Sequence, residues 1–128
     1  MLNEINNVRF ADIQMLRYDQ PGWENLSLKQ KLYIYFLSKA ALFGRDIIFD
    51  QTGKFNLLIR KCLEAVWQGY DFTGHDSERE ALHEYLRRVW FSSGIYHHYG
   101  CEKFQPAFSA EWFEDALNKV EHLLPKGF

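Results

Sequence analysis

The sequence has few cysteines and prolines, and neither sign of charge dominates it. Its 128 residues include 2 cysteines and 3 prolines, and 17 acidic side chains nearly balance 15 basic ones. Two cysteines cannot build a disulfide framework, so Cys62 and Cys101 suit a reducing compartment or a place in the core. A net charge of -2 argues against a protein that binds nucleic acid by neutralising its phosphates.

Long apolar runs are missing as well. No stretch approaches the roughly 18 residues of a membrane span. The first residues, Met1 to Glu4, lack the charged and apolar regions of a signal peptide. We therefore expect a cytoplasmic protein with no membrane span and no nucleic-acid partner.

Aromatic residues are abundant, at 17% of the chain within a hydrophobic content of 47%. Such a composition excludes disordered and linker-like classes. It predicts a bulky core, a ligand groove or an incomplete interface. The length fits one domain, so residues 1–128 are expected to form a single helical domain.

Helical spacing dominates the chain and predicts about five helices in a bundle, a mainly α fold. The clearest helix begins with a capping box at Ser27 and Gln30 and ends at Gly44. It is apolar on most sides, so it should be central in the fold or covered by something else. The other expected helices are 7–16, 54–68, one opening at 76–77, and one starting at Ser109, with 46–53 as a polar-ended connection.

One stretch, Ser92 to Gly100, interrupts this pattern. It has no helical stripe, and residues that favour β-structure lie between Gly94 and Gly100. We expect a short extended segment near residues 94–99, with an exposed edge at which a peptide can pair. Gly94 is expected to allow the close approach of that second backbone.

A search for catalytic chemistry yields no complete constellation. His83-Glu84 begins like a zinc-peptidase helix, but Arg87 and Arg88 stand where the second histidine would fall, so an exposed helix face is expected. Cys101 has no evident base beside it. No catalytic residue, metal ligand or cofactor is therefore assigned to this chain.

Two adjacent histidines, His97 and His98, lie in the expected extended segment. Neighbours on a strand point to opposite faces, so the pair is not expected to chelate one metal ion. One of them can serve as a hydrogen-bonding group in a groove, or both can be ordinary exposed loop histidines. The sequence leaves these two interpretations open.

Three stretches of the chain resemble the dipeptidyl peptidase III family of zinc metallopeptidases. The first begins at Leu26-Ser27-Leu28-Lys29-Gln30 and continues to Gly44. The second is Val89-Trp90-Phe91-Ser92-Ser93-Gly94-Ile95-Tyr96-His97-His98-Tyr99-Gly100, and the third follows as Cys101-Glu102-Lys103-Phe104-Gln105-Pro106. The stretch from Phe10 to Tyr18, with Pro21-Gly22-Trp23, is similar to bacterial members.

The resemblance implies part of a larger enzyme that releases dipeptides from the amino termini of peptides. Its zinc motif, HExxGH, would lie downstream, so the zinc would be bound by residues outside this chain. The segment around Gly94 would be the strand along which the peptide substrate lies. The implied substrate-binding residues are Ser92, Ser93, Gly94, Ile95, Tyr96, His97 and Tyr99.

Two positions depart from the pattern of animal members, in which two asparagines hold the substrate's amino terminus. Ser92 and Ile95 stand there in this sequence, and isoleucine cannot replace an amide. The implied partners are a peptide and the remainder of a peptidase chain, or another protein surface. The alternative is a freestanding helical module that binds peptides or proteins without enzymatic activity.

Overall fold

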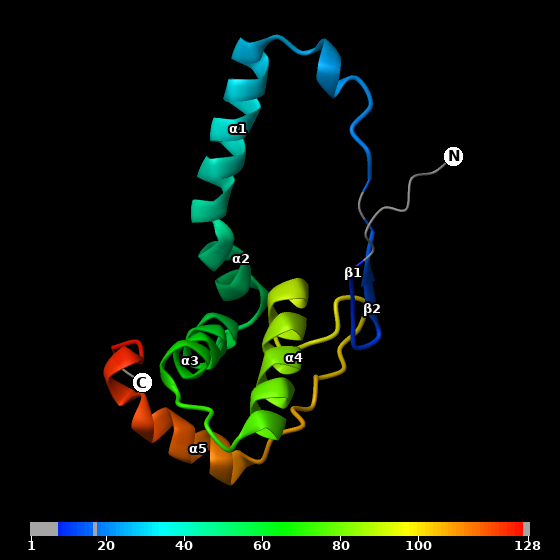
Figure 1. Ribbon diagram of the computed structural model, residues 1–128. Helices are drawn as coiled ribbons and strands as arrows, with labels where there is room; N and C mark the ends of the chain where they lie inside the picture. Colours follow the sequence, from blue (N-terminus) through cyan, green and yellow to red (C-terminus); the bar gives the residue numbers. More distant parts are fainter. Residues whose placement is uncertain (1–7, 17, 127–128) are drawn as a thin grey trace. The chain divides into compact units, whose positions relative to one another are not determined.

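The computed structural model describes residues 8–16 and 18–126 (Figure 1). The chain divides into two compact units, Met1–Gly44 and Arg45–Phe128. The described residues form five α-helices and one antiparallel pair of short strands, which confirms the predicted mainly α fold. The single domain over 1–128 stays a prediction.

The first unit begins with a β-hairpin, so the helix expected over 7–16 is wrong. Strands β1 (Val8–Phe10) and β2 (Ile13–Met15) pair antiparallel, with Phe10 opposite Ile13. Two residues join them, and the first, Ala11, has a left-handed φ of 50°. A two-residue turn of this kind suits the twist of two short antiparallel strands. Asn7, the expected cap, lies outside the described residues.

The clearest predicted helix is present as α1 (Leu28–Phe43), after a short 3-10 helix η1 (Trp23–Asn25). The expected capping box is formed: Gln30 N–H donates to Ser27 Oγ, and Ser27 N–H donates to Gln30 Oε1 over 2.9 Å. Gly44 ends the helix, also as predicted. None of the sixteen residues of α1 is buried, although the helix is apolar on most sides.

The second unit opens with α2 (Arg45–Thr52), where the sequence predicted a connection over 46–53. The predicted connection is therefore wrong: the segment is helical, and Phe49, 2% exposed, is its one buried residue. The other residues of α2 are partly or fully exposed. Thr52 Oγ1 lies 2.7 Å from the carbonyl oxygen of Ile48, in the last turn of the helix.

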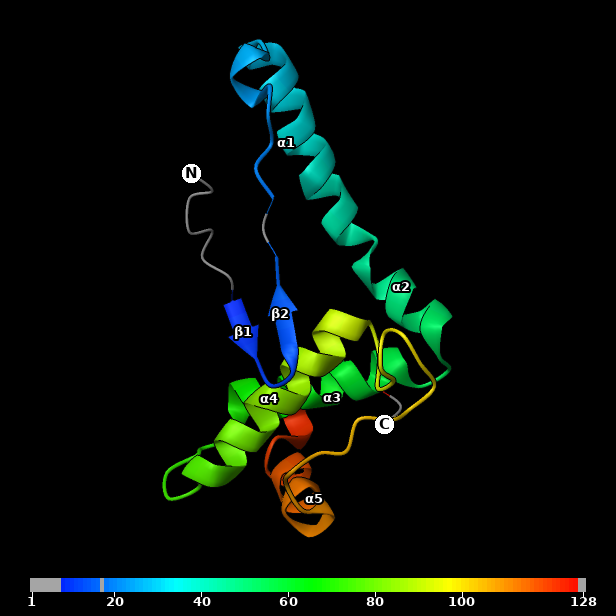
Figure 2. The ribbon, with the colours of Figure 1, turned by 90° about the vertical axis from the view of Figure 1, so that its right-hand side faces the viewer.

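Three longer helices build the core of this unit (Figure 2). They are α3 (Asn56–Gly69), α4 (Asp76–Ser92) and α5 (Ala110–Lys119), followed by the 3-10 helix η2 (Glu121–Leu123). Their starts agree closely with the predicted ones, and Ser109 caps α5 by accepting from Trp112 N–H over 3.1 Å. Among the described residues, no helix is long and apolar enough to cross a membrane.

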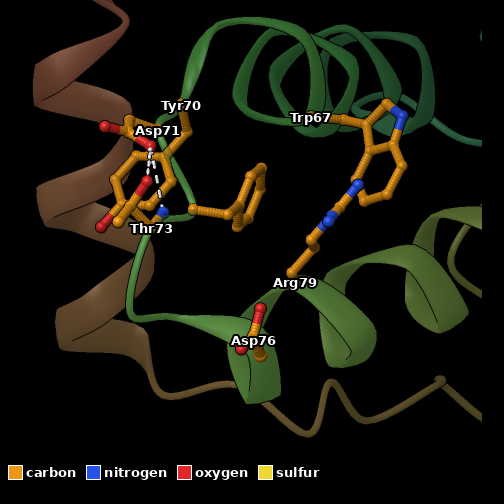
Figure 3. Close-up of a pocket in the computed structure, with 7 residues that line it drawn as sticks. Trp67, Tyr70, Asp71, Thr73, Asp76 and Arg79 are labelled. Carbon is orange, nitrogen blue, oxygen red and sulfur yellow. Dashed lines mark hydrogen bonds between the residues drawn. The ribbon is translucent and has the colours of Figure 1, made fainter.

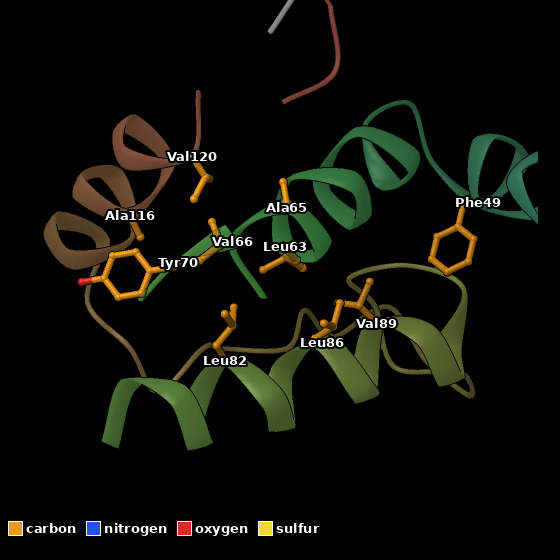
Figure 4. Packing of buried hydrophobic residues seen from close by; sticks show 10 residues of the cluster. All are labelled: Phe49, Leu63, Ala65, Val66, Tyr70, Leu82, Leu86, Val89, Ala116 and Val120. Carbon is orange, nitrogen blue, oxygen red and sulfur yellow. The ribbon is translucent and has the colours of Figure 1, made fainter. Parts of the chain in front are cut away.

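The core is a row of contacts between α3 and α4, closed at one end by α5 (Figure 4). Leu82, Leu86 and Val89 point from α4 toward α3, and each is fully buried. The fully buried Ala116 and Val120 cover the same cluster from the α5 side. Cys62 is also buried, which fits one of the two alternatives that the sequence left open for the cysteines. This core fixes the two ends of α4, where the candidate sites lie.

A buried arginine joins α2 to α3 within the second unit. Arg60 is 5% exposed, and its Nη2 lies 2.6 Å from Asp46 Oδ1. Its guanidinium also lies 4.6 Å from the centre of the Phe49 ring. The hydrogen bond from Arg60 lowers the pKa of Asp46, because it favours the charged carboxylate.

Candidate functional site

Of the extended segment predicted near residues 94–99, the structure contains a single β-bridge, at Tyr96; a turn and bends precede it and a turn follows it. Tyr96 forms an antiparallel bridge with Lys103. His97 N–H donates to the carbonyl of Glu102 over 2.8 Å, and Phe104 N–H donates to the carbonyl of Ile95 over 2.9 Å. Residues 95–97 therefore pair along one edge with residues 102–104.

The other edge of this segment presents the backbone of Tyr96. Successive residues of a strand direct their N–H and C=O groups to alternate sides, so Tyr96 faces away from the strand that Ile95 and His97 contact. No hydrogen bond reaches the Tyr96 N–H or C=O within the described part of the chain. Tyr96 is 38% exposed, and Lys103 Nζ lies 5.7 Å from the centre of its ring. The backbone N–H and C=O of Tyr96 therefore lie on the outer edge of the bridge.

The predicted site residues before Tyr96 have other roles in the backbone. Ser92 is the last residue of α4, and its hydroxyl oxygen is buried without a hydrogen-bond partner among the described residues. Ser93 ends the helix with a left-handed φ of 56°, and its carbonyl accepts from Thr52 Oγ1 over 2.7 Å. Gly94 is buried, and its N–H donates to the carbonyl of Val89 over 3.1 Å. Of the predicted set, only Tyr96 lies in a β-bridge, and Ile95 and His97 form the hydrogen bonds on either side of it.

Asn56, which sequence reasoning missed, holds the start of the extended segment. It is 3% exposed, and its Oδ1 accepts from Ile95 N–H over 3.4 Å. Its carboxamide lies against two glycines: a Cβ on Gly53 would meet Asn56 Nδ2 at 2.7 Å, and one on Gly94 would meet Asn56 Cγ at 2.7 Å. The close approach at Gly94 is therefore made by Asn56, where the sequence predicted a guest backbone.

The two adjacent histidines do not alternate as a strand would require. His97 and His98 stack, with ring centroids 4.5 Å apart and planes at 25°, so the expectation of opposite faces is wrong. The reason is that the chain turns after His97: Gly100 N–H donates to the His97 carbonyl over 3.0 Å. Tyr99 lies in this turn, where its N–H donates to His97 Nδ1 over 3.3 Å and its side chain is 89% exposed.

The described residues contain no group of three or more side chains that could hold a metal ion. His83 and Glu84 lie on an exposed face of α4, as predicted. Glu84 Oε1 accepts from Arg88 Nε over 3.2 Å, and the His83 ring stacks on Trp67 with centroids 4.8 Å apart. Cys101 is exposed beside the turn.

A pocket lies at the other end of α4, against the loop that joins α3 to α4 (Figure 3). Its volume is about 520 Å³, and a neighbouring pocket of about 540 Å³ shares Trp67, Asp76 and Arg79 with it. Figure 3 shows the Arg79 side chain extending from α4 to Trp67, and its guanidinium lies 5.8 Å from the ring centre. Glu80 and His83 line the neighbouring pocket.

The loop side of the pocket carries a carboxylate in a fixed position. Asp71 Oδ1 accepts from the Thr73 N–H over 3.0 Å and from Thr73 Oγ1 over 2.7 Å (Figure 3). These bonds lower the pKa of Asp71, with the bond from the Thr73 hydroxyl as the largest cause. Sequence reasoning did not single out this pocket, because its residues follow no motif spacing.

Comparison with known proteins adds no family assignment. No model of a known protein family matches the chain, and no curated protein matches it significantly.

Proposed function

We propose that this chain is the amino-terminal, substrate-cleft portion of a dipeptidyl peptidase III-like zinc metallopeptidase. In this role it binds the peptide backbone and supplies no zinc ligand, so it is inactive alone. The observation that carries the proposal is the unpaired Tyr96 edge of residues 95–97. This edge lies within the stretch of sequence that most specifically resembles the family.

A peptide would add to this edge as a third strand. The Tyr96 N–H would donate to a carbonyl of the guest, and the Tyr96 carbonyl would accept from a guest N–H. Each such bond contributes only about 0.5–1.5 kcal/mol, because both partners give up water. Two bonds from one residue position a peptide weakly, so tight binding needs a second surface. In the proposed enzyme the other side of the cleft supplies that surface.

Helix α1 supports a larger assembly. Its apolar side chains are exposed on all sides, with exposed fractions of 73% for Leu28, 66% for Tyr33, 64% for Phe36 and 90% for Phe43. Such a continuous apolar surface is characteristic of an interface that another element covers. The residues of α1 also belong to the first stretch that resembles the peptidase family. We propose the remainder of the peptidase chain as the element that covers it.

The amino terminus of the substrate has few partners in this segment. Both backbone groups of Ile95 are already bonded within the chain, to Asn56 and to Phe104, and the hydroxyl of Ser92 is buried at the end of α4. Neither side chain presents an amide to a free amine. We therefore assign the backbone pairing to this chain and expect recognition of the terminal amine elsewhere.

Solution NMR with tetra-alanine tests the pairing directly. We expect the Tyr96 amide resonance to shift on titration and its hydrogen exchange to slow, while a tetra-alanine with N-methylated internal amides has no such effect. The Tyr33 amide on α1 serves as the internal control. Equal shifts with both peptides, or none at Tyr96, would contradict the proposed edge.

Activity measurements test the assignment to a larger enzyme. The purified chain should not hydrolyse dipeptidyl-arylamide substrates, with or without added zinc. Zinc-dependent turnover by the chain alone would refute the assignment, whereas the pairing result above does not depend on turnover.

A freestanding binding module is the second candidate, favoured by the buried core that the unit Arg45–Phe128 has of its own. The mass of the native gene product separates the two. A product ending near Phe128 supports the module, and one several times longer, carrying HExxGH, supports the peptidase.

A further inference from the structure

We propose that the turn after the Tyr96 bridge is a pH-sensitive switch: neutral His97 stabilises the turn, and protonation of His97 opens it. The turn comprises residues 97–100, and its opening releases the backbone N–H of Tyr99. The switch lies beside the Tyr96 edge but uses neither the N–H nor the C=O of that residue, so it does not depend on the proposed peptidase function. The inference depends on two features: the hydrogen bond that the His97 ring accepts, and the second imidazole stacked on that ring.

The ring of His97 accepts a hydrogen bond from the chain that follows it. Tyr99 N–H donates to His97 Nδ1 over 3.3 Å. A ring nitrogen that accepts carries no proton, so the neutral ring carries its proton on Nε2. Protonation adds a hydrogen to Nδ1, which then faces the Tyr99 N–H as one donor against another. The bond therefore forms only with the neutral imidazole, and histidines usually change charge between about pH 5 and 8.

The second imidazole acts in the same direction. The centroid of the His98 ring lies 4.5 Å from that of His97, with 25° between the ring planes, and 4.1 Å from that of Tyr99. Two neutral rings can stack at this distance, whereas two imidazolium ions repel each other. Protonation of both rings therefore separates the stack and breaks the bond to Nδ1 together.

Helix α4 brings no net negative charge to the stack. The guanidinium of Arg88 lies 5.5 Å from the centre of the Phe104 ring, and that ring lies 6.0 Å from the ring of His97. Arg88 Nε also pairs with Glu84 Oε1 over 3.2 Å, on the exposed surface of the helix. The pair as a whole is neutral, so α4 does not attract an added positive charge to His97.

The segment paired with the bridge carries one acidic and one basic residue. Glu102 accepts from the His97 N–H with its backbone carbonyl, and Lys103 Nζ lies near the ring of Tyr96. Cys101, between the turn and this segment, is exposed. Among the described residues, no carboxylate forms an ion pair with either imidazole of the stack. No ion pair in this part of the chain therefore holds either ring in its charged form.

NMR measurements on the full chain test the switch. At about pH 8, the nitrogen chemical shifts of the His97 ring should place its proton on Nε2, and the Tyr99 amide should be protected from exchange with water. At about pH 5, after correction for the intrinsic exchange rate, we expect this protection to fall by about twofold to tenfold, the effect of losing one hydrogen bond. A proton on Nδ1 at the higher pH, or equal protection at both pH values, would overturn the proposal.

Two variants with the same change of side chain locate the switch. His97→Asn keeps a side-chain oxygen in the place of Nδ1, and this acceptor does not titrate. Protection of the Tyr99 amide should therefore stay at its high-pH level over the whole range. His122→Asn, on the exposed 3-10 helix η2, should retain the wild-type response. A pH response that persists in His97→Asn, or that disappears in His122→Asn, would overturn the assignment to His97.

Discussion

The carboxamide of Asn56 and the missing side chain at Gly94 should be energetically coupled. The φ of Gly94 is not left-handed, so alanine fits its backbone conformation. In open space a Gly→Ala change at such a position stabilises a protein by about 0.4–1 kcal/mol. Here the new Cβ would lie 2.7 Å from Asn56 Cγ, far inside the usual carbon contact of about 3.5–4.0 Å. The two effects have opposite signs, so the sign of the measured change decides between them.

The clash should win, because Asn56 cannot move aside. It is 3% exposed and packs against Gly53 on another side. Overpacking of this kind costs about 1–3 kcal/mol. We therefore expect Gly94→Ala to lower the free energy of unfolding by that amount, measured by urea denaturation followed with circular dichroism.

A double-mutant cycle identifies the cause of that loss. In an Asn56→Ala background the clash is gone, so Gly94→Ala should become neutral or slightly stabilising. Gly100→Ala is the matched control, because the nearest atom to its Cβ, Glu102 N, lies 4.0 Å away. A Gly94→Ala protein as stable as the wild type, or a cost unchanged in the Asn56→Ala background, would refute the role of Asn56.

Three further predictions follow from burial and charge. Leu86→Ala should cost about 2–5 kcal/mol in urea denaturation, because Leu86 is fully buried, whereas Leu37→Ala on the exposed α1 should change stability by less than about 0.5 kcal/mol. Cys101 is exposed and should react quickly with a thiol reagent in the folded protein. Cys62 should react only on unfolding, because it is buried and burial raises the pKa of its thiol. Equal reaction rates for the two thiols would contradict the buried position of Cys62. Asp46→Asn should lower the free energy of unfolding near pH 7, because the lowered pKa of Asp46 stabilises the folded protein only while the carboxylate is ionised. The difference from wild type should shrink as the pH falls below the ordinary pKa of aspartate. A difference independent of pH would contradict the stabilising role of the Asp46–Arg60 pair.

The helices with local start signals could be predicted from the sequence. Ser27 with Gln30, and Ser109, supply hydrogen bonds to the first turns of their helices, and the structure contains those bonds. The hairpin at 8–15 was missed because two three-residue strands are too short to separate a period of two from one of 3.6. Helix α2 was missed because Gly44 ends one helix and the next begins at Arg45 without a loop.

The candidate sites depend on contacts that no local pattern encodes. Asn56 meets Ile95 across 39 positions of sequence, and a single buried asparagine has no periodicity. Gly53 and Gly94 could have pointed to Asn56, because their missing side chains make room for its carboxamide. The two glycines come close to Asn56 only when α3 and α4 pack together, so their positions in the sequence do not reveal the contact. The pocket residues Trp67 and Arg79 likewise meet only through that packing.

Helix α4 separates the two candidate sites and makes them independent in experiment. Its 17 residues span about 25 Å, with Asp76 of the pocket in its first turn and Ser92 at its end. The buried Leu82, Leu86 and Val89 hold α4 against α3 along this length. We therefore expect a local change at one end of α4 to leave the structure of the other end unchanged. Effects at such distances usually add within about 0.3–0.5 kcal/mol. Asp76→Asn, in the first turn of α4, should therefore leave the Tyr96 response to tetra-alanine unchanged, and a lost response in this variant would contradict the independence of the two ends.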